Sequence, residues 1–206
     1  MTDATLPPRS RLGAVLAQFG WAPRVAMVVL ALIALAALAA PWIAPHDPLA
    51  MDPLQRLKPP TADHPLGTDN FGRDLFSRVL WGGRVSLLIG IGAAVVSVLI
   101  GMAIGLVAGF FRTMDAIVMR IMDALMAIPA ILLAIALVAL NGPSIGSVIA
   151  AITIPEIPRV VRLVRAVVLS AREEPYVEAA LALGTPLPSV LVRHLLPNTI
   201  APMIVQ

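Results

Sequence analysis

Few residues in this sequence have the types and spacing that catalysis or cofactor binding requires. Lys58 is the one lysine, and no Gly-x-x-x-x-Gly precedes it, so it does not belong to a phosphate-binding loop. His46, His64 and His194 show no spacing typical of a metal site, and the sequence contains no cysteine. A membrane protease would need a Ser/His pair or two aspartates within its helices, and neither is evident. We therefore expect no catalytic residue, no metal site, no cofactor and no enzymatic activity.

Charged residues within an apolar stretch suggest another kind of chemistry, the passage of a solute. Glu156 is the acid most deeply embedded in such a stretch, and with Arg159 it could line a translocation path. The alternative that we favour is an i, i+3 ion pair between these two residues. Arg162 and Arg165 continue the row at every third residue, forming a cationic sector that reaches the head groups or a wet cavity.

Membrane-spanning helices must position these residues. Hydrophobic residues make up 59% of the 206-residue chain and charged residues only 13%, which is typical of a membrane protein. Aromatic residues amount to 4%, and the apolar residues do not follow the alternating pattern of a β-barrel, so we expect α-helical spans. The net charge of +3 comes from arginines that flank apolar runs, which favours a lipid bilayer over nucleic acid as the partner.

The first apolar run covers residues 25–44 and is long enough to cross a bilayer. We favour an uncleaved anchor over a cleaved signal peptide, because the run is long and further spans follow. The distribution of Lys and Arg predicts a cytoplasmic N-terminus. We expect four segments: a cytoplasmic N-terminal segment 1–24, a first span 25–44, an extracytoplasmic connection 45–84 and a core 85–206. Within the core we expect spans at about 86–111, 117–140 and 145–169, then a cytoplasmic elbow 172–197 and the start of the next span 198–206.

Small residues recur at every fourth position along the second expected span. Gly101, Gly105 and Gly109 continue a row that begins at Ala93 and Ser97, so all five lie on one helix face. Such a face lets another helix backbone approach closely, which predicts a packing seam. In the third expected span, charged residues one turn apart predict a local ion pair: Arg120 and Asp123.

The segment from Glu178 to Pro197, EAALALGTPLPSVLVRHLLP, predicts two short helices joined at a fixed angle. Pro175 is well placed to begin the first helix, Gly184 to end it in a left-handed conformation, and Thr185 to cap the second. Tyr176, Ala180 and Gly184 share one face of the first helix, where small side chains would leave a shallow docking surface for another protein. The alternative is a connector without a partner.

The spacing in this segment resembles the EAA loop of ABC-importer permeases, which docks on the ATPase subunit. Glu178-Ala179-Ala180 is followed after three residues by Gly184 and after nine more by His194-Leu195-Leu196-Pro197, with His194 where the family more often has a branched aliphatic residue. A second resemblance covers residues 64–88, which read HPLGTDNFGRDLFSRVLWGGRVSLL. This stretch is similar to the segment that precedes the permease core in the peptide, oligopeptide and nickel class of these importers, in the subunit that carries an extra N-terminal span. The resemblance assigns the ATPase-coupling loop to Tyr176, Glu178, Ala179, Ala180, Gly184 and Pro197.

This resemblance implies an all-α, polytopic transmembrane bundle with the type I ABC-importer permease fold, here with about four complete spans and the start of a fifth. It also implies half of a translocation pore for small peptides or a related solute, in a bacterial-type inner membrane. The implied partners are a homologous permease subunit, two ATP-binding subunits that hydrolyse ATP, and an extracytoplasmic solute-binding protein. The alternative is a secondary transporter or channel subunit without an ATPase. The apolar helix expected from residue 198 is too short at Gln206 to cross a bilayer. We therefore expect the natural chain to continue with two further spans.

Overall fold

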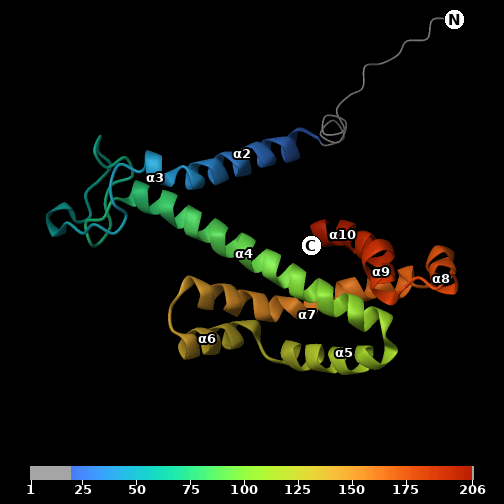
Figure 1. Ribbon diagram of the computed structural model, residues 1–206. Helices are drawn as coiled ribbons and strands as arrows, with labels where there is room; N and C mark the ends of the chain where they lie inside the picture. Colours follow the sequence, from blue (N-terminus) through green and yellow to red (C-terminus); the bar gives the residue numbers. More distant parts are fainter. Residues whose placement is uncertain (1–19, 206) are drawn as a thin grey trace, which may run out of the picture. The chain divides into compact units, whose positions relative to one another are not determined.

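The computed structural model describes residues 20–205, so most of the expected segment 1–24 lies outside the described residues (Figure 1). Within them the secondary structure is helical, apart from one isolated antiparallel bridge between Thr68 and Asp74. The expected all-α fold is confirmed. The chain divides into two compact units, Met1–Leu88 and Ile89–Gln206, and each is described by itself.

The first unit contains α2 (Trp21–Leu38), α3 (Ala40–Ile43), the 3₁₀ turn η1 (Pro53–Gln55) and the first part of α4 (Leu75–Phe110). The aliphatic side chains of α2 are largely exposed, as expected of a helix that faces lipid. Ala37 is buried, and a Cβ atom at Gly83 of α4 would lie 3.2 Å from the Ala37 Cβ. The small residues at this point therefore let α2 and α4 approach each other.

Glycine and aspartate residues build the loop before α4, within residues 45–74. Gly67 and Gly72 have positive φ angles of 75° and 73°, and a Cβ atom at Gly72 would overlap the carbonyl oxygen of Asp52. Asp69 accepts hydrogen bonds from the backbone N–H groups of Phe71 and Arg73, at 2.8 and 3.0 Å. The LGTDNFGRD motif thus closes a compact loop at the start of α4.

The second unit contains the rest of α4, then α5 (Arg112–Ala127), α6 (Ala130–Asn141) and α7 (Ile145–Ala171). The third expected span, 117–140, is not a single straight helix, because α5 and α6 are bent by 87° at their junction. Ile128 is extended there, with φ −88° and ψ 127°. Pro129 causes this, since it disfavours helical geometry in the preceding residue and lacks an N–H group.

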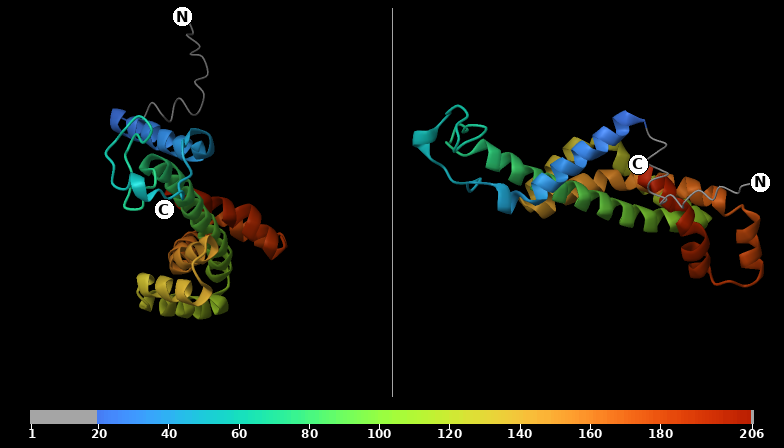
Figure 2. Two further views of the ribbon diagram at one scale, coloured as in Figure 1. Left: turned by 90° about the vertical axis from the view of Figure 1, so that its left-hand side faces the viewer. Right: turned by 90° about the horizontal axis from the view of Figure 1, so that it is seen from above.

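Length and composition select two described helices as candidate membrane spans, α2 and α4, and a third if the bent pair α5 and α6 forms one span. The expected fourth span corresponds to α7, which has 27 residues and continues without interruption through Pro155 and Pro158. This helix is long enough to cross a bilayer. It is not among the candidate spans, because Glu156 and its arginines give it too many charged residues. In the views of Figure 2, α7 lies beside the second half of α4.

The chain ends in α8 (Pro175–Ala182), α9 (Leu187–Val190), a π-helical turn η2 (Leu191–Leu195) and α10 (Leu196–Val205). The last three elements follow one another without a break. In the π turn the Leu196 N–H donates to the carbonyl of Leu191, five residues earlier. Pro197 explains the wide turn, since it has no N–H group to donate and its ring would press on the carbonyl of Arg193.

Candidate functional site

The glycine face of α4 packs against a row of valines on α7. Both rows have i, i+4 spacing and run in the same direction, so each glycine meets one valine. Val160, Val164 and Val168 are at most 3% exposed and form part of the core behind the elbow. A Cβ atom at Gly101, Gly105 or Gly109 would lie 2.5, 2.7 or 2.7 Å from the Cβ atoms of Val160, Val164 or Val168, respectively.

Ion pairs connect α7 to α5. Arg162 donates to Asp123 at 2.6 Å, and Arg165 makes two hydrogen bonds to Asp115. The expected pair between Arg120 and Asp123 is wrong, because the Asp123 carboxylate instead binds Arg162 on the neighbouring helix. The row of arginines on α7 is thus partly neutralised by acids that lie 39 and 50 residues earlier in the chain.

Glu156 and Arg159 form the i, i+3 ion pair that we favoured, with 3.0 Å between the guanidinium and the carboxylate. Both side chains remain well exposed. Glu156 also borders a pocket of about 420 Å³ between α4, α7 and α10, lined mainly by small and aliphatic residues. Its lining includes Gly90, Ala93, Ala94, Ser97, Ile152 and Met203.

The expected start and end of the first elbow helix are confirmed. Pro175 occupies the first turn of α8, and Gly184 has a positive φ of 77°. The Thr185 N–H donates to the Ala180 carbonyl and the Gly184 N–H to the Leu181 carbonyl, both at 3.0 Å. These two bonds define a Schellman motif with glycine at its left-handed position. The angle at which the chain leaves α8 is therefore set by Gly184.

The second elbow helix begins differently from the expectation. Thr185 is not its N-cap: α9 starts at Leu187, and its N-cap is Pro186, which makes no side-chain capping bond. Pro186 holds the chain extended at ψ 139°, so the helix begins one residue later than a Thr185 cap would require. A turn centred on glycine and proline therefore replaces the expected threonine cap.

The elbow is packed against the end of α7. Val177 of α8, Val190 of α9 and Leu195 of η2 are fully buried and join the core formed by Val168 and Ala171. Because each elbow element contributes to one apolar cluster with α7, a displacement of the elbow must disturb α7.

A polar contact links α8 to α10 on the opposite side of the elbow. The Asn198 side chain donates to the Tyr176 hydroxyl at 2.7 Å and to the His194 carbonyl at 2.9 Å. The rings of Tyr176 and His194 are also close, with centroids 6.1 Å apart. Asn198 is not among the residues expected from the sequence, although an asparagine in a helix can bond the carbonyl four residues earlier, here that of His194.

The outer surface of α8 combines acid and apolar groups. Glu178 and Ala179 are exposed, and Leu183 is 86% exposed. The expected docking face of α8 contains Tyr176, Ala180 and Gly184. Tyr176 and Gly184 are exposed, but Ala180 between them is only 8% exposed, so the middle of this face is covered. Among the described residues, the Glu178 carboxylate has no ion pair, and it is free to meet a partner.

Two known families match this chain. Residues 97–206 match the family described as binding-protein-dependent transport system inner membrane component. Residues 23–60 match the N-terminal TM domain of oligopeptide transport permease C. The first match includes Gly101, Gly105, Gly109 and the elbow, and the second includes most of α2 and all of α3.

Individual relatives agree with these families. A probable peptide ABC transporter permease of Sinorhizobium fredii is 56% identical over 84% of this chain, and a putative peptide transport system permease of Brucella suis is 49% identical over 88%. A probable D,D-dipeptide transport system permease of Escherichia coli is 43% identical over 87%. This chain spans 59%, 62% and 60% of the lengths of these three relatives.

Proposed function

Because this chain belongs to the family of binding-protein-dependent transport system inner membrane components, we propose that it is a permease subunit of an ATP-driven importer for small peptides. Its relatives are named as peptide and dipeptide permeases, which supports this class of solute. In this role the chain contributes half of the translocation pore, together with a homologous permease. It is not itself an enzyme, and two ATP-binding subunits supply the hydrolysis.

The elbow is the observation that carries this proposal. It presents Glu178 and Leu183 outward while Val177 and Val190 bury its other side against α7. A surface element that is rigidly capped and packed against a long helix can pass a displacement from a partner into the bundle. The row of valines on α7 that supports the elbow also packs on the glycines of α4, so the motion would reach two helices that lie along the pore.

Membrane orientation and the solute path are part of the same proposal. The N-terminus and the elbow lie in the cytoplasm, and the connection between α2 and α4 faces outward, where a solute-binding protein would deliver the peptide. The pocket beside Glu156 is a candidate stretch of the path, because a charged pair beside small residues can bind a polar solute without closing the passage.

Two variants in the whole transporter test the coupling role of the elbow. Glu178→Lys replaces attraction for a basic or hydrogen-bonding group on the ATPase with repulsion. Gly184→Val forces a branched residue into the left-handed conformation and changes the angle of the elbow. We expect membrane insertion to remain normal, while retention of the ATPase and peptide uptake both fall about tenfold or more.

Glu173→Lys is the matched control, since it makes the same charge change at an exposed position before α8 begins. It should retain most of the uptake, and Tyr176→Ala should lose less than either elbow variant. Wild-type uptake and ATPase retention in both Glu178→Lys and Gly184→Val would reduce the elbow to a passive connector and remove the main support for the importer.

A further inference from the structure

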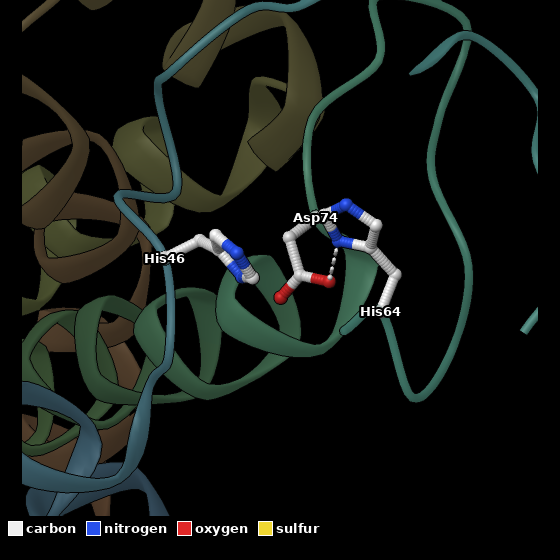
Figure 3. Close-up of side chains that lie close together, drawn as sticks. All are labelled: His46, His64 and Asp74. Atoms are coloured by element: carbon white, nitrogen blue, oxygen red, sulfur yellow. Dashed lines mark hydrogen bonds and ion pairs between the residues drawn. The ribbon is translucent and has the colours of Figure 1, made fainter. Parts of the chain in front are cut away.

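Three side chains that are distant in the sequence meet in the connection between α2 and α4. His46 follows α3, His64 lies in the loop, and Asp74 immediately precedes α4 (Figure 3). One ligand atom from each residue lies within 4.8 Å of the other two. The sequence offered no spacing typical of a metal site, because the three residues come together only through the folding of the loop.

The loop holds these residues in place by backbone hydrogen bonds. The Asp74 carboxylate accepts the Ser77 N–H at 2.8 Å, and the Ser77 hydroxyl accepts the His46 N–H at 3.2 Å. The His64 N–H donates to the Thr61 hydroxyl at 3.1 Å, and the His64 carbonyl accepts two backbone N–H groups. The backbones of His46 and His64 are thus held without their ring atoms, and the Asp74 carboxylate is oriented by Ser77.

The donor groups suit a transition metal. His64 Nδ1 lies 3.0 Å from Asp74 Oδ1, and the rings of His46 and His64 have centroids 4.7 Å apart. Ligands that share a tetrahedral zinc ion are roughly 3.3 Å apart, so one pair already has that spacing. The ring nitrogen of His46 lies within 4.8 Å of the other two ligand atoms. Because His46 is exposed, its side chain has room to rotate and shorten these distances.

Asp74 is suited to be the anionic ligand. Its side chain is 1% exposed. One carboxylate oxygen, Oδ2, accepts the Ser77 N–H at 2.8 Å, and the other, Oδ1, lies 3.0 Å from His64 Nδ1. A buried carboxylate can serve as a metal ligand, and imidazole with carboxylate is a ligand set that zinc accepts.

The surroundings leave room for the rest of a coordination shell. The cluster borders a pocket of about 350 Å³ whose lining includes three further carboxylates, Asp47, Asp52 and Asp63. These acids add negative potential around the cluster, and the space accommodates a water molecule as a fourth ligand.

A simple structural pair is the competing explanation, in which Asp74 only holds His64 and the start of α4. That explanation accounts for two residues but not for His46. Among the described residues, no hydrogen bond involves a ring nitrogen of His46, yet the ring is stacked beside His64 with its nitrogens within ligand range of the carboxylate. A free imidazole beside the contact between His64 Nδ1 and Asp74 Oδ1 is an arrangement that a metal ion would complete, the ion replacing any proton held between those two atoms.

We propose that His46, His64 and Asp74 bind one divalent first-row transition metal, with zinc as the best match, and that the ion fastens the connection between α2 and α4. The proposal is independent of the transport function, because it rests on this loop alone. A metal bound only by the folded loop stabilises it in proportion to the logarithm of the metal concentration.

Titration of the purified full chain with ZnCl₂ tests the site, using an affinity tag without histidine. We expect about one zinc ion per chain by calorimetry, a higher melting temperature, and visible absorption from Co²⁺ in the same site. His46→Gln and His64→Gln should each weaken zinc binding tenfold or more, and Asp74→Asn should do the same while keeping an acceptor for Ser77.

His194→Gln is the matched control, because it removes the third histidine from the elbow and should leave zinc binding unchanged. The His46→Gln chain serves as its own folding control, since the replaced ring makes no described hydrogen bond and its elution volume should match the wild type. The absence of stoichiometric zinc binding in the wild type, or binding that persists in His46→Gln and His64→Gln, would overturn the proposal.

Discussion

At the scale of single residues, glycine has two distinct physical roles in this chain. At Gly105 the constraint is space, since a Cβ atom would lie 2.7 Å from Val164 Cβ and 2.9 Å from the Val161 carbonyl oxygen. At Gly184 the constraint is conformation, since the φ angle is 77° while no atom lies within 4 Å of a Cβ atom there. The two sites therefore fail differently on substitution: one by collision, the other by backbone strain.

Gly105→Ala should lower the melting temperature of the purified chain by several degrees, because overpacking of this seam costs about 1–3 kcal/mol. Gly90→Ala in the same helix is the control, since a Cβ atom there has nothing within 4 Å. We expect it to be neutral or slightly stabilising. Equal melting temperatures for the two variants in detergent would show that α4 and α7 do not pack closely through Gly105.

At the scale of helices, the sequence predicted the ends of α8 but not the pairing between helices, and the expected Thr185 cap is wrong. The start of α8 at Pro175 and its end at Gly184 depend on residues within one or two turns, so the sequence sufficed. Asp123 was assigned to Arg120 because both lie in one helix, whereas it binds Arg162. The choice between two arginines depends on which face of α5 meets α7, and that is decided by tertiary packing.

The same limit applies to the metal cluster and to the bend in the third expected span. His46, His64 and Asp74 meet through a loop without periodicity, so no spacing rule applies to them. Pro129 was visible in the sequence, but an apolar run continues across it, and the run was read as one span. Pro129 explains the break, but the angle of 87° that the two helices adopt there is not given by any local rule.

The ion pairs between α5 and α7 predict a measurable coupling between these helices. Arg165→Ala leaves the half-buried Asp115 carboxylate without its two hydrogen bonds, which should cost about 1.5–3 kcal/mol of stability. Arg159→Ala is the control, because its pair with Glu156 is more exposed and lies within one helix, so about 0–1 kcal/mol should be lost.

Thermal unfolding of both variants in detergent measures the difference, and the exchange Asp115→Arg with Arg165→Asp should recover part of the loss. Two results would contradict this account. One is an Arg165→Ala chain that is as stable as the Arg159→Ala chain. The other is an exchange variant that is less stable than Asp115→Arg alone and Arg165→Asp alone.

At the scale of the whole molecule, the directions of the helices agree with the proposed orientation. The contacts of Gly101 with Val160 and Gly109 with Val168 show that α4 and α7 run parallel. If both helices cross the membrane, the chain must return between them, and the bent pair α5 and α6 is a candidate for that return. If α2 enters from the cytoplasm, as proposed, then α4 and α7 would both run toward the cytoplasm, and the elbow after α7 would lie on that side.

Cysteine labelling suits a test of this orientation, because these 206 residues contain no cysteine. Leu54, Leu140 and Leu183 are 87%, 83% and 86% exposed, so single cysteines at these positions should react equally when reached. In sealed cells a membrane-impermeant maleimide should label Leu54→Cys and Leu140→Cys but not Leu183→Cys. Permeabilised cells that lack the ATPase subunits should label all three, which separates membrane shielding from cover by a partner. Labelling of Leu183→Cys in sealed cells would reverse the orientation and place the elbow where no ATPase could reach it.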